Sequence, residues 1–320
     1  MRREIHLAQY HVNTLGPGDP FRDWLVDTLG KRIHNKHCEV LVFKHSSASH
    51  TVCRYSFKGE HLSVIAKFFA EPTGRLKEYN PYKGMMNEYG NLEKAASVID
   101  VARPIAVNRH FHCALVTEYI PGKSLSWYFK HETQLYEKLG SIAELLRRLH
   151  THTSSPSYEK MKEFSNIHEV LDHLRLGPET RETFNHLLGK WWYSSLIDRD
   201  YGCMLHRDVH PANYIFYKGK PYALDFESSW HQGNPVRDLG ILSAELKNYF
   251  ELHKGGGWKA EPYIGHFLWE YCRNEKEFRQ ITEILPFYMS VGLLRTARLQ
   301  RSGHRDYLIN EAIACLKAVR

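Results

Sequence analysis

Residues 205–225, LHRDVHPANYIFYKGKPYALD, constrain the fold more than any other stretch of this 320-residue chain. Polar residues fill the first half and are typical of a loop. The aromatic and aliphatic runs that follow, at 214–217 and 222–224, predict two short strands. The sequence KGKP at 218–221 separates them and is typical of a turn. The segment is therefore predicted to form a loop followed by a β-hairpin.

This hairpin would fold Asp225 back beside Asn213, and Asp208 lies five residues before Asn213. Carboxylate and amide oxygens are hard ligands that suit Mg²⁺. Transfer of the γ-phosphoryl group of ATP requires such a set, in which one carboxylate accepts the proton of the attacking hydroxyl while the other groups hold the metal against the phosphates. A polar loop before a hairpin is the alternative, but the full set at this spacing favours a phosphotransferase site.

The pattern H-x-D-x-x-x-x-N, followed by a strand ending in D-F, resembles the aminoglycoside phosphotransferase and choline kinase-like family of the protein-kinase-like superfamily. The resemblance implies an α+β, bilobal protein-kinase-like fold. Its N-terminal lobe would hold an antiparallel sheet plus one helix, its C-terminal lobe would be mostly helical, and ATP would bind between them. The implied organisation is an N-terminal extension (1–35), a nucleotide-binding N-lobe (36–120) and a helical C-lobe with the catalytic loop and acceptor site (121–320).

The resemblance also assigns roles to the polar residues of the catalytic loop. Asp208 would accept or orient the proton of the acceptor hydroxyl, and Asn213 and Asp225 would hold Mg²⁺. His206 is the second catalytic candidate: we expect it to support the loop, and its neutral imidazole as the general base remains the alternative. Asp238, thirteen residues after Asp225, would begin a helix and brace the loop through its backbone.

Upstream, Lys67 lies within the apolar run LSVIAKFF at 62–69, which predicts a buried strand. A lysine in such a run needs a partner or a position that faces solvent. Kinases place their phosphate-contacting lysine on the third strand in this setting. The family commonly has a glutamate four residues before a leucine in the next helix, which favours Glu88 over Glu93 as the partner of Lys67. An exposed helix glutamate is the alternative for Glu88.

Further strands are predicted at 39–44, 51–57, 101–107 and 111–119. The loop HSSASH at 45–50 would lie over the phosphates, with donors from its small serines in place of the glycines of a typical kinase loop; these candidate residues are Ser46, Ser47 and Ser49. By resemblance, the segment after the last strand is the hinge, in which the C=O of Glu118 and the N–H of Ile120 would bind the adenine edge.

Composition limits the partners. The formal charge is +7, yet no dense Lys/Arg run or nucleic-acid module is present, so no nucleic acid is expected. No apolar run approaches the length of about 18 residues that a transmembrane helix needs, so no membrane insertion is expected. The six cysteines are scattered without a CxxC pair, which predicts buried free thiols in a reducing compartment and a cytoplasmic protein.

The acceptor is expected to be a small molecule with a hydroxyl group. Asp238 lies only thirteen positions after Asp225, which leaves little room for the activation segment and peptide-docking platform of a protein kinase. Roughly fifty residues separate the amphipathic helix predicted at 135–149 from His206, and this insertion would line the acceptor site. Two alternatives stay open, an atypical protein Ser/Thr kinase and a catalytically silent nucleotide-binding module. The acceptor could be an amino sugar, a choline-like alcohol, a sugar or a nucleoside.

Overall fold

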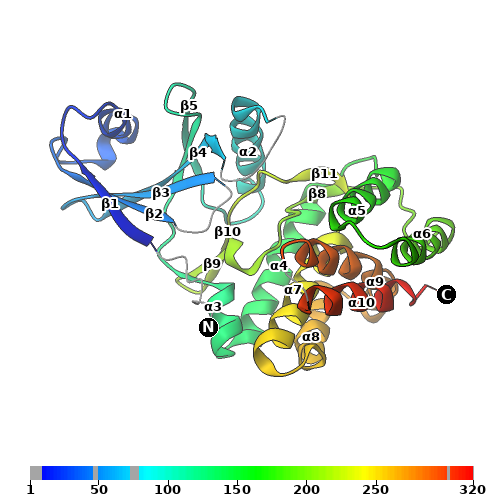
Figure 1. Ribbon diagram of the computed structural model, residues 1–320. Coiled ribbons are helices and arrows are strands. Elements are labelled where there is room, and N and C mark those ends of the chain that lie inside the picture. Colours follow the sequence, from blue (N-terminus) through cyan, green and yellow to red (C-terminus); the bar gives the residue numbers. More distant parts are fainter. Residues whose placement is uncertain (1–8, 46–49, 73–78, 301–302, 320) are drawn as a thin grey trace. The chain divides into compact units, whose positions relative to one another are not determined.

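The chain forms two compact units in the computed structural model, which describes residues 9–45, 50–72, 79–300 and 303–319 (Figure 1). Unit 1 comprises Met1–Ser97 and Val101–Pro121, and unit 2 comprises Val98–Asp100 and Gly122–Arg320. An antiparallel sheet dominates unit 1 and helices dominate unit 2. This confirms the predicted α+β class with a sheet-bearing first part and a mostly helical second part.

The sheet of unit 1 has six strands, in the order β1-β2-β3-β4-β6-β5, and every neighbouring pair is antiparallel. All five strands predicted for this part are present, with their ends displaced by up to three residues. The strands are β1 (Gln9–Leu15), β2 (Val40–His45), β3 (His50–Phe57), β4 (Leu62–Pro72), β5 (Pro104–Asn108) and β6 (Ala114–Glu118).

The segment before residue 36 contributes a strand and a helix to unit 1. β1 pairs with β2 along its length, and α1 (Pro20–Leu29) follows β1 in the chain. Asp19 caps the start of α1 by accepting the N–H of Arg22, and Pro20 fits the first helical position. The apolar face of α1 then packs into one core with side chains of the sheet, which include Val40, Val42, Tyr55, Phe57, Val64 and Ala66.

The two faces of β4 have different partners, because successive side chains of a strand point to opposite sides. Ala66 and Phe68 join the core that contains α1, whereas Lys67 between them reaches α2 (Pro81–Ala96). Gly84 allows α2 to come close, since a Cβ there would lie 3.2 Å from the Phe69 ring and 2.4 Å from the hydroxyl of Tyr79. The buried charge of Lys67 is thus on the face of the sheet that α2 covers.

Unit 2 contains most of the helices and two small sheets. Its helices are α3 (Leu125–His131), α4 (Leu135–His152), α5 (Lys160–Leu174), α6 (Pro178–Tyr193), α7 (Val236–Lys254), α8 (Glu261–Tyr271), α9 (Glu275–Ala297) and α10 (His304–Leu316). One sheet has the order β10-β9-β7, and the other pairs β11 with β8. Their strands are β7 (Lys123–Ser124), β8 (Cys203–Leu205), β9 (Tyr214–Tyr217), β10 (Lys220–Ala223) and β11 (Trp230–Gly233).

The core of unit 2 follows the predicted helical periodicity. α4 spans the predicted helix, and Leu139, Ile142, Leu146 and Leu149 on its apolar stripe are fully buried. The insertion before His206 forms the two helices α5 and α6. The indole N–H of Trp191 on α6 donates to the carbonyl of Leu316 at 2.9 Å, which ties α6 to the end of α10.

All six cysteines are free thiols, and the prediction that they are buried holds for four of them. Three lie in unit 1 (Cys38, Cys53 and Cys113) and three in unit 2 (Cys203, Cys272 and Cys315), and the first four of these are buried. Burial raises the thiol pKa of Cys272 to about 12 and of Cys315 to about 11, and it raises the pKa of Cys203 further. These thiols are therefore poor nucleophiles in the native fold.

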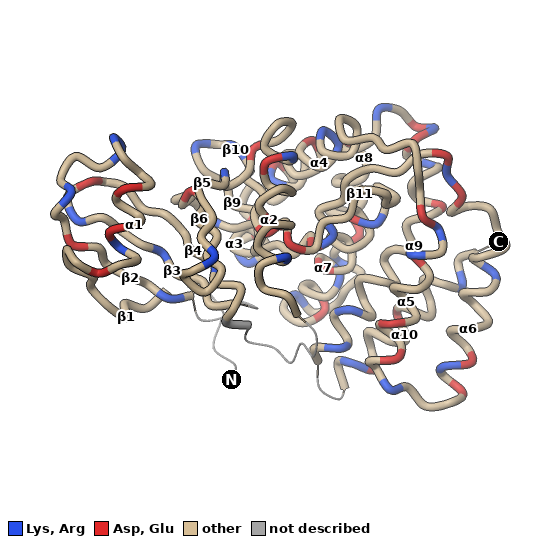
Figure 2. Tube along the Cα trace, turned by 90° about the horizontal axis from the view of Figure 1, so that it is seen from above, with Lys and Arg blue, Asp and Glu red and all other residues tan. Residues whose placement is uncertain are grey.

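Charged residues of both signs occur throughout the described parts of the chain. In Figure 2 the positions of Lys and Arg (blue) and of Asp and Glu (red) are interspersed along the tube of each unit. None of the helices in the described ranges combines the length and the apolar character that crossing a membrane requires.

Candidate active site

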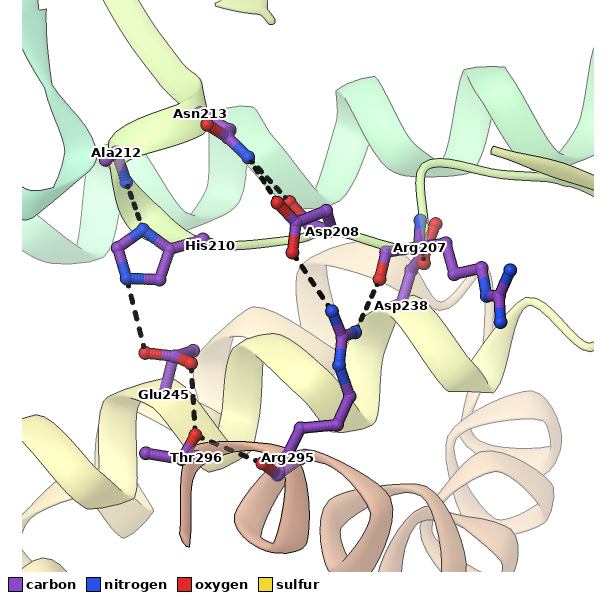
Figure 3. A network of polar contacts seen from close by, with 10 residues as sticks. Arg207, Asp208, His210, Ala212, Asn213, Asp238, Glu245, Arg295 and Thr296 are labelled. Carbon is purple, nitrogen blue, oxygen red and sulfur yellow. Dashed lines mark hydrogen bonds and ion pairs between the residues drawn. The ribbon is translucent and has the colours of Figure 1, made fainter. Parts of the chain in front are cut away.

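The catalytic loop runs from the end of β8 into the 3₁₀ turn η2 (Pro211–Asn213), and it brings Asp208 and Asn213 together (Figure 3). Asn213 Nδ2 donates to Asp208 Oδ2 and to the Asp208 carbonyl, both at 3.0 Å. Because both bonds use the amide nitrogen, Oδ1 of Asn213 points away from Asp208. That oxygen is the atom through which an asparagine binds a metal ion.

Asp238 braces the loop, which confirms its predicted structural role. It lies in the first turn of α7 and accepts the backbone N–H groups of His206 at 2.7 Å and Arg207 at 2.9 Å. Burial alone would raise the pKa of Asp238, but the hydrogen bond and charge of His150, the charge of His206 and the Arg207 N–H lower it. The backbone of Arg207 has a positive φ of 70°, a conformation that needs such support.

His206 is fully buried in unit 2 and contacts the end of the hairpin. Its Nε2 lies 2.8 Å from the carbonyl oxygen of Leu224, so this nitrogen carries the proton and donates. The ring packs against Phe226 with centroids 4.5 Å apart, and Nδ1 has no hydrogen-bond partner among the described residues. These contacts join the catalytic loop to the segment around Asp225, which is the supporting position expected for His206.

The predicted hairpin is present, but its turn is shorter than the predicted four residues. β9 and β10 pair from Tyr217 with Lys220 onward, so the turn consists of Lys218 and Gly219 alone. Both have positive φ, 49° and 79°, as a two-residue hairpin turn of the type I′ class requires. Pro221 lies within β10 instead, where the missing N–H is tolerated because β10 is an edge strand.

The hairpin returns the chain to Asn213, since the N–H of Leu224 donates to the Asn213 carbonyl at 2.9 Å. Asp225 follows immediately, with a positive φ of 59°. Carboxylate oxygens of Asp225 and Glu227 lie within 4.8 Å of each other. The oxygen-only donor set of Asn213, Asp225 and Glu227 fits Mg²⁺ in its chemistry.

Arg295, on α9, contacts Asp208, and the sequence pattern did not identify it. Its Nη2 lies 3.1 Å from Asp208 Oδ1, and Nη1 donates to the carbonyl of Arg207 at 2.7 Å (Figure 3). Arg295 is 87 positions from Asp208 and belongs to no motif, so only the packing of α9 reveals the contact.

A second series of polar contacts connects the loop, through His210, to Glu245 and Thr296. His210 Nδ1 accepts the N–H of Ala212 at 3.2 Å, and its Nε2 lies 3.8 Å from Glu245 Oε2 on α7. Thr296 donates to Glu245 Oε1 at 3.3 Å (Figure 3). Burial raises the pKa of Glu245, against the opposing effects of His210 and Thr296. These residues hold η2 against α7 and α9.

In unit 1, Lys67 on β4 forms an ion pair with Glu88 on α2, with Nζ 2.8 Å from Oε2. Both side chains are nearly excluded from solvent, at 10% and 4% exposed. An ion pair at such a site is costly to desolvate and gives little net stability, so its presence favours a function other than stability. The pairing of Lys67 with Glu88, instead of Glu93, agrees with the residue favoured from the sequence.

For the other residues predicted to contact the nucleotide, the structure gives the location of Glu118 and Ile120. Glu118 is the last residue of β6, and its N–H donates to the carbonyl of Arg103 at 2.9 Å. Ile120 follows two residues later with its side chain buried. Their hinge role stays a prediction. Ser46, Ser47 and Ser49 lie outside the described residues.

The sequence and the fold are similar to those of known phosphotransferases. A family model described as the phosphotransferase enzyme family matches residues 54–261. A choline/ethanolamine kinase family protein from Mesorhizobium loti has a similar structure, with a TM-score of 0.57, 17% identity, and 94% of this chain and 98% of that chain covered. A choline kinase from Cryptosporidium parvum Iowa II is also similar, with a TM-score of 0.59 and 11% identity. The match covers 87% of this chain and 88% of that chain.

The ADP-bound aminoglycoside phosphotransferase APH(2'')-Ib is similar too, with a TM-score of 0.55, 14% identity, and 94% and 97% of the two chains covered. No curated protein matches the sequence. At these identities the solved structures establish the protein-kinase-like fold. The family model covers more than half of the residues, and it includes the catalytic loop, the hairpin, Lys67 and Glu88. The chain belongs to the phosphotransferase enzyme family.

Proposed function

We propose that this protein is an ATP- and Mg²⁺-dependent phosphotransferase that phosphorylates a hydroxyl group of a small molecule. The observation that carries the proposal is the arrangement of Asp208 and Asn213 in a loop whose backbone Asp238 braces. A loop that only connected two strands would not need a buried carboxylate to hold two consecutive N–H groups.

The proposed roles follow from the donor chemistry of each residue. Asp208 accepts a hydrogen bond from the acceptor hydroxyl and takes its proton as the phosphoryl group transfers. Asn213 Oδ1 and Asp225 bind Mg²⁺, which when bound neutralises charge on the phosphates. Lys67, oriented by Glu88, contacts the phosphates of ATP. Glu118 and Ile120 bind adenine through their backbone groups, and Ser46, Ser47 and Ser49 are proposed phosphate donors.

A small acceptor is favoured over a protein because of the connection between Asp225 and Asp238. Within it, β11 pairs with β8, and α7 begins at Val236. Little chain therefore remains for the activation segment of a protein kinase. A catalytically silent module is disfavoured because such modules often lose one of the residues corresponding to Asp208, Asn213 or Asp225, and this chain has all three.

The experiment that tests the proposal is a screen of hydroxyl-bearing metabolites for ATP consumption in the presence of Mg²⁺, with phosphorylated products detected by mass spectrometry. We expect product formation with at least one small acceptor and none with the Asp208→Asn variant. Phosphorylation of a generic protein substrate, without any small acceptor, would favour the protein kinase alternative. Failure of purified protein to bind ATP with Mg²⁺ would refute the proposal.

A further inference from the structure

We propose that the acceptor carries an anionic group, a carboxylate or a phosphate, near the hydroxyl that is phosphorylated, and that Arg295 recognises this group. The inference rests on the proposed function and extends it to the chemical class of the acceptor. It is built within unit 2, from the residues that surround Asp208 in Figure 3.

The position of Arg295 follows from its contact with the reacting carboxylate. An acceptor hydroxyl that transfers its proton to Asp208 lies about 2.5–3.0 Å from one of its oxygens. Arg295 Nη2 lies 3.1 Å from Oδ1 of the same carboxylate. The guanidinium must then lie within roughly 8 Å of the acceptor hydroxyl. An anionic group a few bonds from that hydroxyl can reach it.

Arg295 also has hydrogen-bonding capacity to spare. A guanidinium has five N–H donors in a planar fork. The contacts of Arg295 within the chain are one through Nη1 to the Arg207 carbonyl and one through Nη2 to Asp208. Its side chain is 30% exposed, so it is partly accessible to solvent. Arginine with an accessible fork suits the two oxygens of a carboxylate or phosphate.

The charges around Asp208 favour an anion over a cation. Arg207 adds a second guanidinium, and its contact is with an amide, Nη2 to Asn166 Oδ1 at 3.2 Å. No carboxylate of the described residues lies within ion-pair distance of Arg207. Burial, together with the charges of Arg237 and Arg295, lowers the pKa of Arg207 to about 10.

Among the described residues, one carboxylate lies within ion-pair distance of this pair of arginines. It is Asp208, which contacts Arg295 and is itself proposed to react. Glu163 forms its own ion pair with Arg237, and Glu169 and Glu245 act on Arg207 and Arg295 only from longer range. At contact distance two guanidinium groups therefore meet one carboxylate, and an anionic acceptor would balance this local excess of positive charge.

The size of the expected effect follows from Coulomb's law. Two unit charges about 8 Å apart, in an effective dielectric near 20, interact by enough to change an equilibrium constant roughly thirtyfold. Solvent and salt reduce this value for a partly exposed arginine. We therefore expect at least about tenfold preference for an anionic acceptor over a neutral one of similar shape.

Matched acceptors that differ in charge provide the test. Glycerol is compared with glycerate and glycerol 3-phosphate, and ethanolamine with serine, which adds a carboxylate to the same amino alcohol. We expect kcat/KM for the anionic member to exceed that for its counterpart by about tenfold or more. The two anions of the glycerol series separate carboxylate from phosphate recognition.

Variants of Arg295 separate recognition of the acceptor from support of Asp208. Arg295→Gln removes the charge, so the ratio of kcat/KM between anionic and neutral acceptors should fall toward one, mainly through a higher KM for the anion. Arg295→Lys keeps the charge and should keep most of the ratio. A purely structural role would lower kcat for both acceptors equally and leave the ratio unchanged. The exposed Arg298, on the same helix end, provides the matched control Arg298→Gln.

A binding measurement decides the case in which no member of the series is turned over. The guanidinium NMR signal of Arg295, assigned by its loss in Arg295→Gln, should shift with millimolar glycerate or glycerol 3-phosphate and not with glycerol or choline. No shift with either anion, or an equal shift with choline, would overturn the inference. So would faster turnover of cationic than anionic acceptors, a result that would still leave the proposed phosphotransferase activity intact.

Discussion

At the scale of single residues, Asp208 differs from an ordinary loop carboxylate because a separate donor holds each of its oxygens. Asn213 donates to Oδ2 and Arg295 to Oδ1. Two such contacts restrict the rotation of the side chain about its χ angles, so the carboxylate needs little rearrangement to meet an acceptor hydroxyl. Positioning of this kind can supply a large part of the rate acceleration in phosphoryl transfer.

Replacing Asp208 by asparagine should therefore affect chemistry more than binding. The change keeps the size of the side chain but removes the proton acceptor, and we expect kcat to fall by about two or more orders of magnitude. The KM for ATP should change little, because no proposed ATP contact involves Asp208. Steady-state kinetics with the identified acceptor, or slow ATP hydrolysis before it is known, provides the measurement. Near-normal turnover here, with loss in His206→Ala, would identify His206 as the base.

Lys67 should support the use of ATP because of its position in the fold, and not only because it is positively charged. It is buried against Glu88, whereas Lys83 on the same helix as Glu88 is exposed. We expect Lys67→Ala to reduce kcat/KM for ATP by roughly tenfold or more, the scale of losing one buried charge-assisted contact. Lys83→Ala should leave it unchanged. Equal losses in the two variants would mean that general positive charge, and not a dedicated lysine, supports phosphate binding.

At the scale of elements, the β9–β10 hairpin determines where Asp225 lies. Its two-residue turn sets the register, and the bond from Leu224 to Asn213 closes the far end. A one-residue change in the turn would shift every pair in the hairpin. The metal-binding proposal for Asp225 therefore depends on Lys218 and Gly219 as much as on Asp225 itself.

Asp225→Ala should abolish the Mg²⁺ dependence of nucleotide binding and leave the fold intact. The carboxylate is half-buried at the hairpin end, so its removal creates no large cavity, while Mg²⁺ loses a charged oxygen ligand. Calorimetric titration with ATP, with and without Mg²⁺, measures the effect, and circular dichroism checks the fold. If the variant responded to Mg²⁺ as the unaltered protein does, Asp225 would not be a metal ligand.

Asp238 joins the catalytic loop to α4 and α7, and this connection makes stability depend on pH. Because its folded pKa is lowered below the unfolded value of 3.8, the stabilisation is complete above pH 4 and is lost as pH falls through the folded pKa. We expect Asp238→Asn to lower the free energy of unfolding by about 1–3 kcal/mol at pH 7. The deficit should shrink toward pH 3. Urea unfolding at several pH values measures both effects.

Asp306 offers a matched control for this experiment. It is also an aspartate in the first turn of a helix, α10, but it is exposed. Asp306→Asn should lower the free energy of unfolding by no more than about 1 kcal/mol, which is the scale of the interaction of a charge with a helix N-terminus. A pH-independent deficit in Asp238→Asn would mean that packing, and not ionisation, is what the loop requires from Asp238.

At the scale of the molecule, each unit has a core of its own, and the core of unit 1 includes residues before position 36. Leu25 on α1 is fully buried among side chains of β2, β3 and β4. We expect Leu25→Ala to destabilise unit 1 by about 2–5 kcal/mol, as cavity-forming changes do. Leu299, which is 77% exposed, provides the control, and Leu299→Ala should be nearly neutral. Little effect of Leu25→Ala on the unfolding of unit 1 would show that α1 is not part of its core.

The sequence predicted most elements and the catalytic loop because these depend on local patterns. Runs of β-branched, aromatic and aliphatic residues located the strands of unit 1, and a helical period located α4. Motif spacing located Asp208, Asn213 and Asp225. Local patterns fail where a contact joins distant segments. The strand β1 was not predicted, because it is defined by its pairing with β2. The position of Arg295 was not predicted either, because it depends on the packing of α9 beside the loop. The shorter turn depended on positive φ at Lys218, which composition alone did not indicate.

The distribution of the thiols gives a way to time the opening of each unit. Three cysteines belong to each unit, and four of the six are buried, so a small thiol reagent should modify the native protein slowly. Unfolding of unit 1 would expose Cys38, Cys53 and Cys113, and unfolding of unit 2 would expose the other three. Mass spectrometry of peptides after a labelling pulse would therefore report the opening rate of each unit separately, from the cysteines that the sequence already contains.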